Sequence, residues 1–505
     1  MIKEFKDYKG NIDEVADVCV VGTGAGGAVV AKELAQKGLN VVVLEEGSSF
    51  STRNFNQDPG DMMAMMYRDS GATMALGLPP ASITLGKGIG GTTTINSATC
   101  FRTPESVIDQ WVKEYDCKGL EYKDLVPYFE RVEDEINVTE LSEDQLGNCY
   151  KIMKRGSSRL GLEVTPLKHN VKNCDGAGAC QWGCVKGAKQ SMEITYVPRA
   201  DKAGARIYAN CRAEKLLVES GRVKGISGHV MDPSRGKMRY RVRVRSKIVC
   251  TAMGTLITPA FLLRQRLANT SGELGKGLTI HPCGRVVAEM DEIVDGHHAV
   301  SQGGQMDAYS AEGIHMEGIF IPPGIMAMAL PGVGEEHKYL AAHYRNLAAF
   351  GFLISDTTRG RVFPAMFGYS FLAWYSMNQK DAELFRKGVA YLADIFFAAG
   401  AKRVFTGCYS MPVLHSRDEL KAFNAIKIRP WHFDVMAFHP LGTCRMGNDP
   451  RKSVVDLNLE AHDIKGLFIP DGSPFPTSLG VNPQITIMSF ANRTADYIAE
   501  NIGRY

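Results

Sequence analysis

A histidine and an asparagine near the end of the chain carry the side chains needed for chemistry on a hydroxyl group. His439 lies in the segment Phe-His-Pro-Leu-Gly-Thr-Cys-Arg-Met-Gly, and Asn482 lies in Gly-Val-Asn-Pro-Gln. An imidazole titrates near neutral pH and can take a proton, and a carboxamide can hold an oxygen atom. A lone His-Pro is more often a buried structural histidine, and His281, which precedes a proline, keeps that interpretation.

Four glycines and an acid have the spacing of a dinucleotide site. Gly22, Gly24, Gly26 and Gly27 stand between a predicted strand and a predicted helix, and Glu45 follows about twenty residues later. Such glycines allow a tight turn and close approach of the backbone to a pyrophosphate, which the helix N-terminus attracts. Glu45 can accept hydrogen bonds from the ribose hydroxyls. We therefore predict a dinucleotide-binding site.

The order of the predicted elements favours FAD over NAD. The nucleotide-fold pattern stops after Gly47 and returns only at residues 205–265 and 464–500. A nicotinamide enzyme would normally complete its sheet with consecutive βα units. The interleaved order fits FAD, and Asp471 with Gly472 ends the late strand, where the acid can bind a ribityl chain.

A helix predicted to start at Pro483 directs its positive end toward the isoalloxazine ring, where negative charge develops on reduction. Asn482 and Pro483 are therefore also expected to contact the cofactor. No second Gly-x-Gly-x-x-Gly follows a strand, which argues against a separate nicotinamide site.

Hydrophobic patterning predicts the elements that must position these residues. Strands are expected at 15–21 and 40–46 around a helix at 25–37, which makes a compact βαβ unit. Residues 50–105 lose this periodicity and are expected to form a long traverse that carries ligand contacts. Further elements are helices at 109–115 and 123–132, strands at 205–217, 222–230 and 238–249, a helix entered at Pro259, and a loop at 322–332.

Composition excludes several classes of protein. The net charge is only +3 over 505 residues, and the one basic run, residues 239–245, alternates like a strand with one basic face. Nucleic-acid binding therefore has little support. No secretion signal and no membrane-spanning run of about eighteen apolar residues is expected. The twelve cysteines lie mostly in apolar strands, which favours free thiols in a cytoplasmic protein.

Four separated segments resemble the glucose-methanol-choline (GMC) family of flavoprotein oxidoreductases, across essentially the whole chain. They are the glycine segment with Glu45, residues 88–96 (Gly-Ile-Gly-Gly-Thr-Thr-Thr-Ile-Asn), residues 254–259 (Gly-Thr-Leu-Ile-Thr-Pro) and the block from His439 to Asn482. The resemblance implies an α+β fold with an interleaved Rossmann-like FAD-binding domain and a substrate domain built on an antiparallel sheet.

The resemblance also predicts two discontinuous domains. Residues 1–104, 200–290 and 432–505 are expected to form the FAD-binding domain, and residues 105–199 and 291–431 the substrate-binding domain.

The resemblance also assigns contacts to the cofactor. Gly90, Gly91 and Asn96 are expected to line the flavin, and the main chain near Ala213 to contact the adenine. Some relatives attach FAD through a histidine near this glycine loop. Because the loop has none, FAD is expected to bind non-covalently.

The implied reaction is FAD-dependent oxidation of an alcohol to a carbonyl, with hydride transfer to flavin N5 and His439 as base. Asn482 would orient the substrate oxygen, as in the cholesterol-oxidase-like and long-chain-alcohol-oxidase-like members, which share Gly-x-Asn-Pro. The pairs Asp449-Pro450 and His462-Asp463 instead resemble gluconate- and fructose-type sugar dehydrogenases.

Cys174, Cys180 and Cys184 all lie within one stretch of eleven residues, in a glycine-rich segment. Three thiolates could hold an iron-sulfur cluster that relays electrons from the flavin, although the spacing matches no common ferredoxin pattern. The alternative is a loop with packed thiols or a disulfide. The presence or absence of a cluster bears on the electron acceptor. The acceptor could be oxygen or, as we favour, a quinone or an acceptor protein.

The sequence indicates the substrate class less directly than the cofactor. A methionine-rich segment, residues 61–80, could cover a hydrophobic or secondary alcohol or could simply fill a core. A sugar or polyol dehydrogenase with an electron-transfer subunit, an oxygen-using alcohol or sterol oxidase, and a flavin-containing electron-transfer component without alcohol chemistry remain the alternatives.

Overall fold

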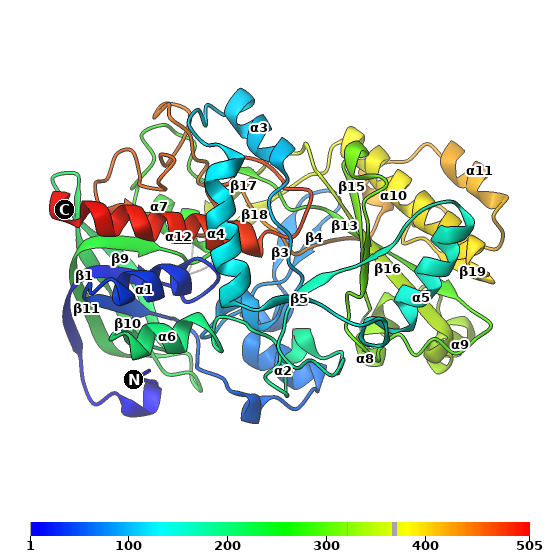
Figure 1. Ribbon diagram of the computed structural model, residues 1–505, viewed down its shortest axis with the longest axis horizontal. Coiled ribbons are helices and arrows are strands. Elements are labelled where there is room, and N and C mark those ends of the chain that lie inside the picture. The colour runs from blue at the N-terminus through cyan, green and yellow to red at the C-terminus, as the bar shows by residue number, and fades with distance from the viewer. Residues whose placement is uncertain (1, 321, 366–370) are drawn as a thin grey trace.

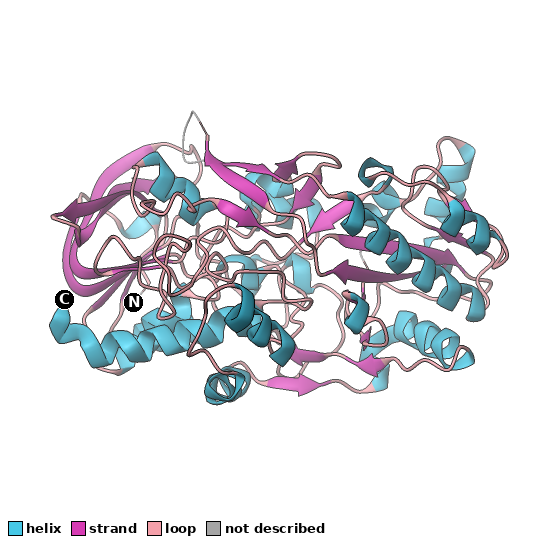
Figure 2. Cartoon of the chain, turned by 90° about the horizontal axis from the view of Figure 1, so that it is seen from above, coloured by secondary structure: helices cyan, strands magenta, loops and turns pink. Residues whose placement is uncertain are grey.

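Two β-sheets organise an elongated molecule, and long irregular segments run between them (Figures 1 and 2). The structure is a computed structural model that describes residues 2–320, 322–365 and 371–505. The first sheet lies at the end that also holds both termini, and the second extends from the middle to the other end.

The first sheet is the predicted nucleotide-binding sheet. Its strands follow the order β8-β2-β1-β11-β10-β9, and β22 pairs with β11. The neighbours from β8 to β11, and β22, are parallel, whereas β10 is antiparallel to both β11 and β9. The bounds are β1 Ile12–Val21, β2 Val41–Leu44, β8 Arg206–Tyr208, β9 Cys211–Glu219, β10 Arg222–Met231, β11 Met238–Thr251 and β22 Leu467–Phe468.

The second sheet is mixed and mostly antiparallel, with the order β12-β17-β18-β3-β4-β21-β13-β16-β15-β14-β6 and a branch through β19 and β20. Only the β18–β3 and β4–β21 pairs among its described strands are parallel. The bounds are β3 Met74–Leu76, β4 Ala81–Ile83, β6 Thr165–Pro166, β12 Lys276–Leu278, β13 Cys283–Glu289, β14 Gly304–Met306, β15 Ile314–Gly318, β16 Leu347–Ile354, β17 Gly360–Pro364, β18 Phe371–Trp374, β19 Arg403–Phe405, β20 Val413–Leu414 and β21 Val435–Ala437; β5 Val138–Glu140 and β7 Lys168–Asn170 form a separate ribbon.

Helices cover both sheets. α1 packs on α6 and α12 beside the first sheet, and α10 packs on β13 and β16 of the second. This covering explains why the four residues of β2 are all buried, as the continuous apolar run requires. The bounds are α1 Gly27–Gln36, α2 Pro59–Met66, α3 Glu105–Glu114, α4 Tyr122–Glu135, α5 Glu143–Arg159, α6 Tyr196–Lys202, α7 Ile257–Arg264, α8 Pro323–Ala329, α9 Glu335–Ala342, α10 Gln379–Ala398, α11 Glu419–Ala425 and α12 Gln484–Asn501.

The predicted fold class is confirmed: a Rossmann-like unit is joined to a sheet with antiparallel parts. The βαβ unit and the helices α3, α4, α7 and α12 appear where the patterns predict them. The domain boundaries stay a prediction. Five strands from the segments assigned to FAD binding belong to the second sheet, namely β3, β4, β12, β13 and β21, so this sheet is itself assembled from both sets of segments.

Two predicted irregular segments contain regular structure. The traverse at 50–105 includes α2, β3 and β4, and the predicted loop at 322–332 contains α8. Asp58 caps α2 by accepting a hydrogen bond from the Asp61 amide, and Pro59 and Pro323 occupy first-turn positions that tolerate proline. The expectation of irregular structure was therefore wrong at these positions; a side-chain cap supports α2, and α8 begins at a proline without such a cap.

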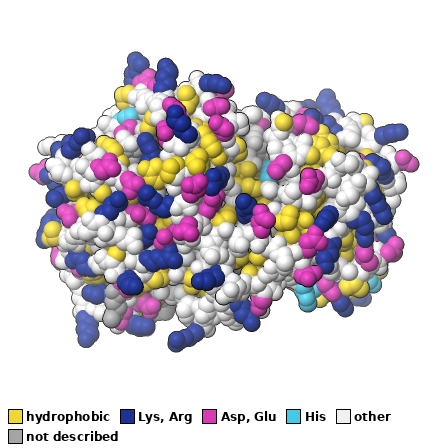
Figure 3. All heavy atoms as spheres, viewed as in Figure 1, with side chains coloured by type: hydrophobic (Ala, Val, Ile, Leu, Met, Phe, Trp, Pro, Cys, Tyr) yellow, Lys and Arg dark blue, Asp and Glu magenta, His cyan; other side chains and the backbone are white. Residues whose placement is uncertain are grey.

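The face of the molecule in Figure 3 mixes positive and negative side chains, and hydrophobic side chains lie between them, some of them in groups. This pattern fits the small net charge. None of the helices in the described part of the chain combines the length and hydrophobicity of a membrane-spanning helix.

Candidate active site

A cavity of about 430 Å³ lies between the two sheets and collects most of the predicted site residues. Its wall includes both predicted catalytic side chains, His439 and Asn482, and all the predicted cofactor contacts except Gly27 and Gly90. Residues far apart in the sequence therefore meet at one site.

The glycine segment forms a cradle at one end of the cavity. A Cβ atom on Gly26 would lie 1.5 Å from the Pro470 carbonyl oxygen, and one on Gly22 would lie 2.3 Å from that of Ala252. Gly22 also has a φ of +99°, which favours glycine. By contrast, a Cβ on Gly24 would meet nothing within 4 Å, so this glycine opens into the cavity. A backbone surface kept free in this way fits a pyrophosphate.

Gly27 has a packing role behind this cradle. A Cβ there would lie 2.1 Å from the Gly22 carbonyl oxygen, so the residue allows α1 to approach the end of β1. Gly27 thus shapes the loop without reaching the cavity wall.

Glu45 directly follows β2, and only 6% of the residue is exposed. Its Oε2 accepts hydrogen bonds from the Thr23 amide (3.0 Å) and hydroxyl (2.8 Å), and Oε1 accepts one from the Gly47 amide (2.9 Å). Burial raises the pKa of Glu45, while these donors oppose the shift. Because a carboxylate oxygen can accept two bonds, Oε1 retains one position for a ligand. Acceptance of both ribose hydroxyls stays a prediction.

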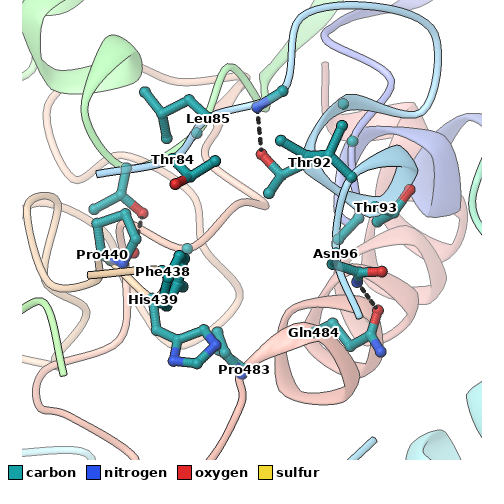
Figure 4. A pocket seen from close by; sticks show the side chains of 18 of the residues that line it. Thr84, Leu85, Thr92, Thr93, Asn96, Phe438, His439, Pro440, Pro483 and Gln484 are labelled. Atoms are coloured by element: carbon teal, nitrogen blue, oxygen red, sulfur yellow. Dashed lines mark hydrogen bonds between the residues drawn. The ribbon is translucent and has the colours of Figure 1, made fainter. Parts of the chain in front are cut away.

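The loop at 88–96 packs against the glycine cradle. The Gly90 amide donates to the Thr23 hydroxyl (3.1 Å), and a Cβ on Gly91 would lie 2.9 Å from the Gly24 Cα. Asn96, on the cavity wall, donates from Nδ2 to Gln484 Oε1 at 2.9 Å (Figure 4). The loop therefore joins the first nucleotide-binding turn to the start of α12.

Asp471 and Gly472 lie on the cavity wall just after β22. Asp471 Oδ2 accepts hydrogen bonds from the Gly254 amide (2.9 Å) and the Thr258 hydroxyl (2.6 Å), while Oδ1 accepts from the Ser473 amide (2.9 Å). Burial raises its pKa. The acid thus fixes the 254–258 segment, and its use by a ribityl chain stays a prediction. Ala213, in β9, also lines the cavity, as expected for an adenine contact.

His439 lies across the cavity from Asn96 in the view of Figure 4, and Pro483 lines the same cavity. The ring is partly exposed to the cavity, but Nδ1 is buried and has no hydrogen-bond partner among the described residues. Burial, helped by the nearby His281 and His315, lowers the pKa of His439 well below its usual value. The imidazole is therefore neutral near pH 7 and able to accept a proton.

His281 connects the segments that carry His439 and Asn482. Its Nε2 accepts hydrogen bonds from the Leu479 amide (2.8 Å) and the Gly480 amide (3.1 Å), which makes Nδ1 the donor to the His439 carbonyl oxygen at 3.2 Å. The two imidazole rings lie edge to face with centroids 5.5 Å apart. His281 thus has a structural role, fixing the position of His439 relative to the loop that carries Asn482.

Asn482 is 8% exposed and immediately precedes Pro483, the N-cap of α12. Within the described residues, its buried Oδ1 has no hydrogen-bond partner. A buried unpaired amide oxygen costs about 1–3 kcal/mol, so its persistence beside an open cavity fits a place reserved for a ligand. Together with the open backbone at Gly24, it shows that the residues present fit a flavin dinucleotide and a substrate.

Sequence reasoning missed the polar residues that the second sheet contributes. His315 and Glu317 share one face of β15, and Glu317 lines the cavity with Gln302. Burial raises the pKa of Glu317, while His315, Gln302 and Asn482 lower it in part. The alternation His-Met-Glu in a short strand was the one available signal, and it resembles no catalytic motif.

The described structure gives no support to an iron-sulfur cluster at the three cysteines of the glycine-rich segment. No group of three or more His, Cys, Asp or Glu side chains in the described chain, which includes all three thiols, could hold a metal ion. All three are free thiols, and the sulfurs of Cys174 and Cys184 accept backbone hydrogen bonds at 3.4 Å. Lys189 Nζ ties the segment down by donating to the Cys180 carbonyl oxygen (2.6 Å). These hydrogen bonds favour the alternative of a packed loop with free thiols.

The methionine-rich segment divides between core and cavity. Met62 and Met66 pack in a buried cluster with Trp182, whereas Met63 and Tyr67 line the cavity. Tyr67 stacks on Trp182 with ring centroids 6.0 Å apart. The segment therefore both fills a core and closes one side of the cavity.

Family models and relatives agree with this geometry. Two models described as GMC oxidoreductase match residues 63–283 and 372–491, and an NAD(P)-binding Rossmann-like model matches residues 20–75. A GMC-type oxidoreductase of Mycobacterium tuberculosis is 31% identical over 97% of this chain and 76% of its own length. One of Sinorhizobium fredii is 31% identical over 95% of this chain and 94% of its own. A long-chain-alcohol oxidase of Arabidopsis thaliana is 27% identical over 96% of this chain and 68% of its own.

Solved structures share the fold at low sequence identity. Pyridoxine 4-oxidase from Mesorbium loti gives a TM-score of 0.72 at 18% identity, covering 95% of this chain and 99% of that one. A formate oxidase variant from Aspergillus oryzae gives 0.74 at 15% identity, covering 99% and 100%. The chain therefore belongs to the GMC oxidoreductase family, a family of FAD-binding flavoproteins.

Proposed function

We propose that this flavoprotein oxidises an alcohol to a carbonyl compound, with His439 as the base and Asn482 as the group that orients the substrate oxygen. The observation that carries the proposal is that His439 and Asn482, from two separate segments, line one cavity, where the buried Asn482 Oδ1 has no partner among the described residues. FAD, bound non-covalently by the cradle described above, would supply the hydride acceptor at N5.

The protein's own groups would manage the hydroxyl proton. Nδ1 of His439 is closed to solvent while the ring is partly exposed, so Nε2 is the nitrogen that would take the proton. The lowered pKa keeps the imidazole neutral before it does so. Asn482 offers both a donor and an acceptor to hold the oxygen.

The cavity wall supports a hydrophobic or secondary alcohol as substrate. Met63, Ile325, Phe352, Met436 and Phe438 contribute apolar surface. The similarity to long-chain-alcohol oxidases adds support.

A sugar or polyol is the second candidate, because Gln302 and Glu317 provide hydrogen-bonding groups on the same wall. A relative named paromamine 6'-oxidase, 25% identical, supports this alternative.

For the electron acceptor, the proposal is a dehydrogenase that passes electrons to a quinone or a partner protein, with an oxygen-using oxidase as the alternative. A cytoplasmic location is also proposed, since all twelve cysteines are free thiols.

One anaerobic experiment tests the proposal. Purified protein with bound FAD is mixed with alcohols, sterols and sugars while the flavin absorbance is followed, and oxygen is then added. We expect rapid bleaching by at least one class of alcohol and slow recolouring in air. Failure across the panel would instead favour an electron-transfer component, and fast recolouring would favour an oxidase.

A further inference from the structure

Arg285 is a buried cation on the wall of the substrate cavity that the reaction described above does not use. It lies in β13, and its side chain is 9% exposed. Burial lowers its pKa, so the environment disfavours the charged form. A guanidinium kept in such a place needs a partner anion.

The partners that the protein supplies are weak. The nearest carboxylate is that of Asp434, whose Oδ2 is 3.9 Å from the Arg285 Nη2 and whose side chain is 53% exposed. The Met436 sulfur is 3.9 Å from Nη1. Among the described residues no oxygen lies within hydrogen-bonding distance of this guanidinium. A paired carboxylate would lie at about 2.8 Å and would engage two N–H groups, so most of the five donors of Arg285 are available.

The sheet register places Gly351 between this guanidinium and Glu317. Arg285 pairs with Gly351 of β16, and Gly351 pairs with Glu317 of β15. Directly opposed residues in antiparallel strands point to the same face. The glycine has no side chain of its own in the middle of this row, and the apolar Ile319 side chain lies there, 3.0 Å from where a Cβ on Gly351 would be. Adjacent strands lie roughly 4.8 Å apart, which separates Arg285 from Glu317 by about 10 Å.

The row therefore runs from Arg285 to Glu317, at the end of the cavity where the proposed reaction takes place. Glu317 lies near Asn482, which lowers its pKa in part. Between the two ends, Ile319, Met436 and Phe438 line the same cavity. A ligand that fits would have a short apolar body, a hydroxyl group at one end and an anion at the other.

We propose that Arg285 binds a carboxylate group of the alcohol substrate, which makes the substrate a hydroxy acid. This inference rests on the proposed alcohol oxidation. A carboxylate fits better than a phosphate ester, because one guanidinium must balance the ligand in the presence of the Asp434 and Glu317 carboxyl groups. A doubly charged phosphate would meet more repulsion there.

The first test compares substrates of matched length. The enzyme with bound FAD is mixed anaerobically with ω-hydroxyalkanoates and with 1-alkanols of the same chain length, in the wild type, Arg285→Met and Arg285→Lys. We expect the wild type to be reduced on the order of thirty- to a hundredfold more efficiently by the hydroxy acids. Arg285→Met should lose this preference and keep its activity on alkanols, and Arg285→Lys should retain part of it. Equal efficiency in the wild type, or equal loss on both substrates in Arg285→Met, would overturn the proposal.

The second test does not depend on turnover. Simple alkanoates, which have no hydroxyl group to oxidise, are titrated against the flavin spectrum of the same proteins and of Asp434→Asn. We expect binding that weakens on the order of thirtyfold or more in Arg285→Met and tightens in Asp434→Asn, where the competing carboxylate is gone. Binding that is unchanged in both variants would overturn the proposal. If no alcohol reduces the flavin but alkanoate binding behaves as expected, the proposed oxidation fails and the anion site stands.

Discussion

At the scale of single residues, the site is marked by buried polar atoms that the protein leaves unpaired. Asn482 Oδ1 and Glu317 Oε2, on two residues of the cavity wall, have no partner among the described residues. An unpaired buried polar atom costs about 1–3 kcal/mol, so a ligand that formed a hydrogen bond with either of these two oxygens would be stabilised there. Asn482 belongs to a segment with a recognisable sequence pattern. Glu317 does not, and only the folded sheet reveals its position.

The glycine cradle gives a prediction that separates cofactor binding from folding. A side chain on Gly24 meets no protein atom within 4 Å of its Cβ, so Gly24→Val should fold with a thermal midpoint close to that of the wild-type protein without FAD. Its affinity for FAD should nevertheless fall at least about tenfold, because the valine side chain would occupy the space for the pyrophosphate. Titration of the apoprotein with FAD, followed by flavin fluorescence, measures the loss.

Gly10→Val is the matched control, since a Cβ at Gly10 is also unopposed but lies outside the cavity. It should bind FAD normally. Unchanged FAD affinity in Gly24→Val would show that the cradle does not hold the cofactor.

At the scale of elements, one histidine connects three segments around the site. His281 precedes β13, receives hydrogen bonds from the loop before α12 and donates to the segment that carries His439. The pKa of His281 is lowered by burial to about 4, against an ordinary value of 6.5. These contacts therefore need the neutral ring, and acid should weaken the junction.

The expected pH dependence follows from this shift. Above pH 6.5 the ring is neutral in both states and its full contribution to stability is present. As the pH falls from 6.5 toward 4, the unfolded chain takes up a proton that the native ring does not, so the free energy of unfolding falls by up to about 3 kcal/mol. The difference in unfolding free energy between the wild type and His281→Gln, measured with urea at each pH, should therefore shrink on acidification. A difference that stays constant over this range would contradict the role of the buried neutral ring.

Local patterns predicted the nucleotide-binding elements well. β1, α1 and β2 are contiguous, and the apolar runs and the glycine turn that specify them lie within one short segment. β3 and β4 have three residues each, and β3 gains its other neighbour, β18, from almost three hundred residues away. Such strands depend on distant partners rather than on their own periodicity. Arg285 and Glu317 could not be identified from the sequence for the same reason. They lie in one row across the sheet only because β13 pairs with β16 and β16 pairs with β15.

At the scale of the whole molecule, the cavity is enclosed by both sheets. Its wall takes residues from β1, β9 and α12 at one end and from β13, β15 and β16 at the other. The cofactor site is thus part of the connection between the two halves in Figure 1. Ligand binding to the native state alone must stabilise the whole fold.

Removing FAD should therefore lower the thermal stability of the entire chain. With free FAD at about one hundred times its Kd, the stabilisation is about 2.7 kcal/mol, which corresponds to several degrees in Tm. Thermal scans of the apoprotein with increasing FAD should show one transition that moves upward with concentration. A Tm that ignores FAD would contradict a cofactor site built from both halves.

The central claim, that His439 accepts the proton of the alcohol, is tested most directly by one rate. Anaerobic stopped-flow mixing of an active alcohol with the wild type and with His439→Ala measures flavin reduction, after the FAD content and Tm of both have been matched. We expect the variant to keep its FAD and to be reduced several hundredfold more slowly, within the range of about 10²–10⁴ for loss of a general base. Near-normal reduction in a variant that retains FAD would contradict the account.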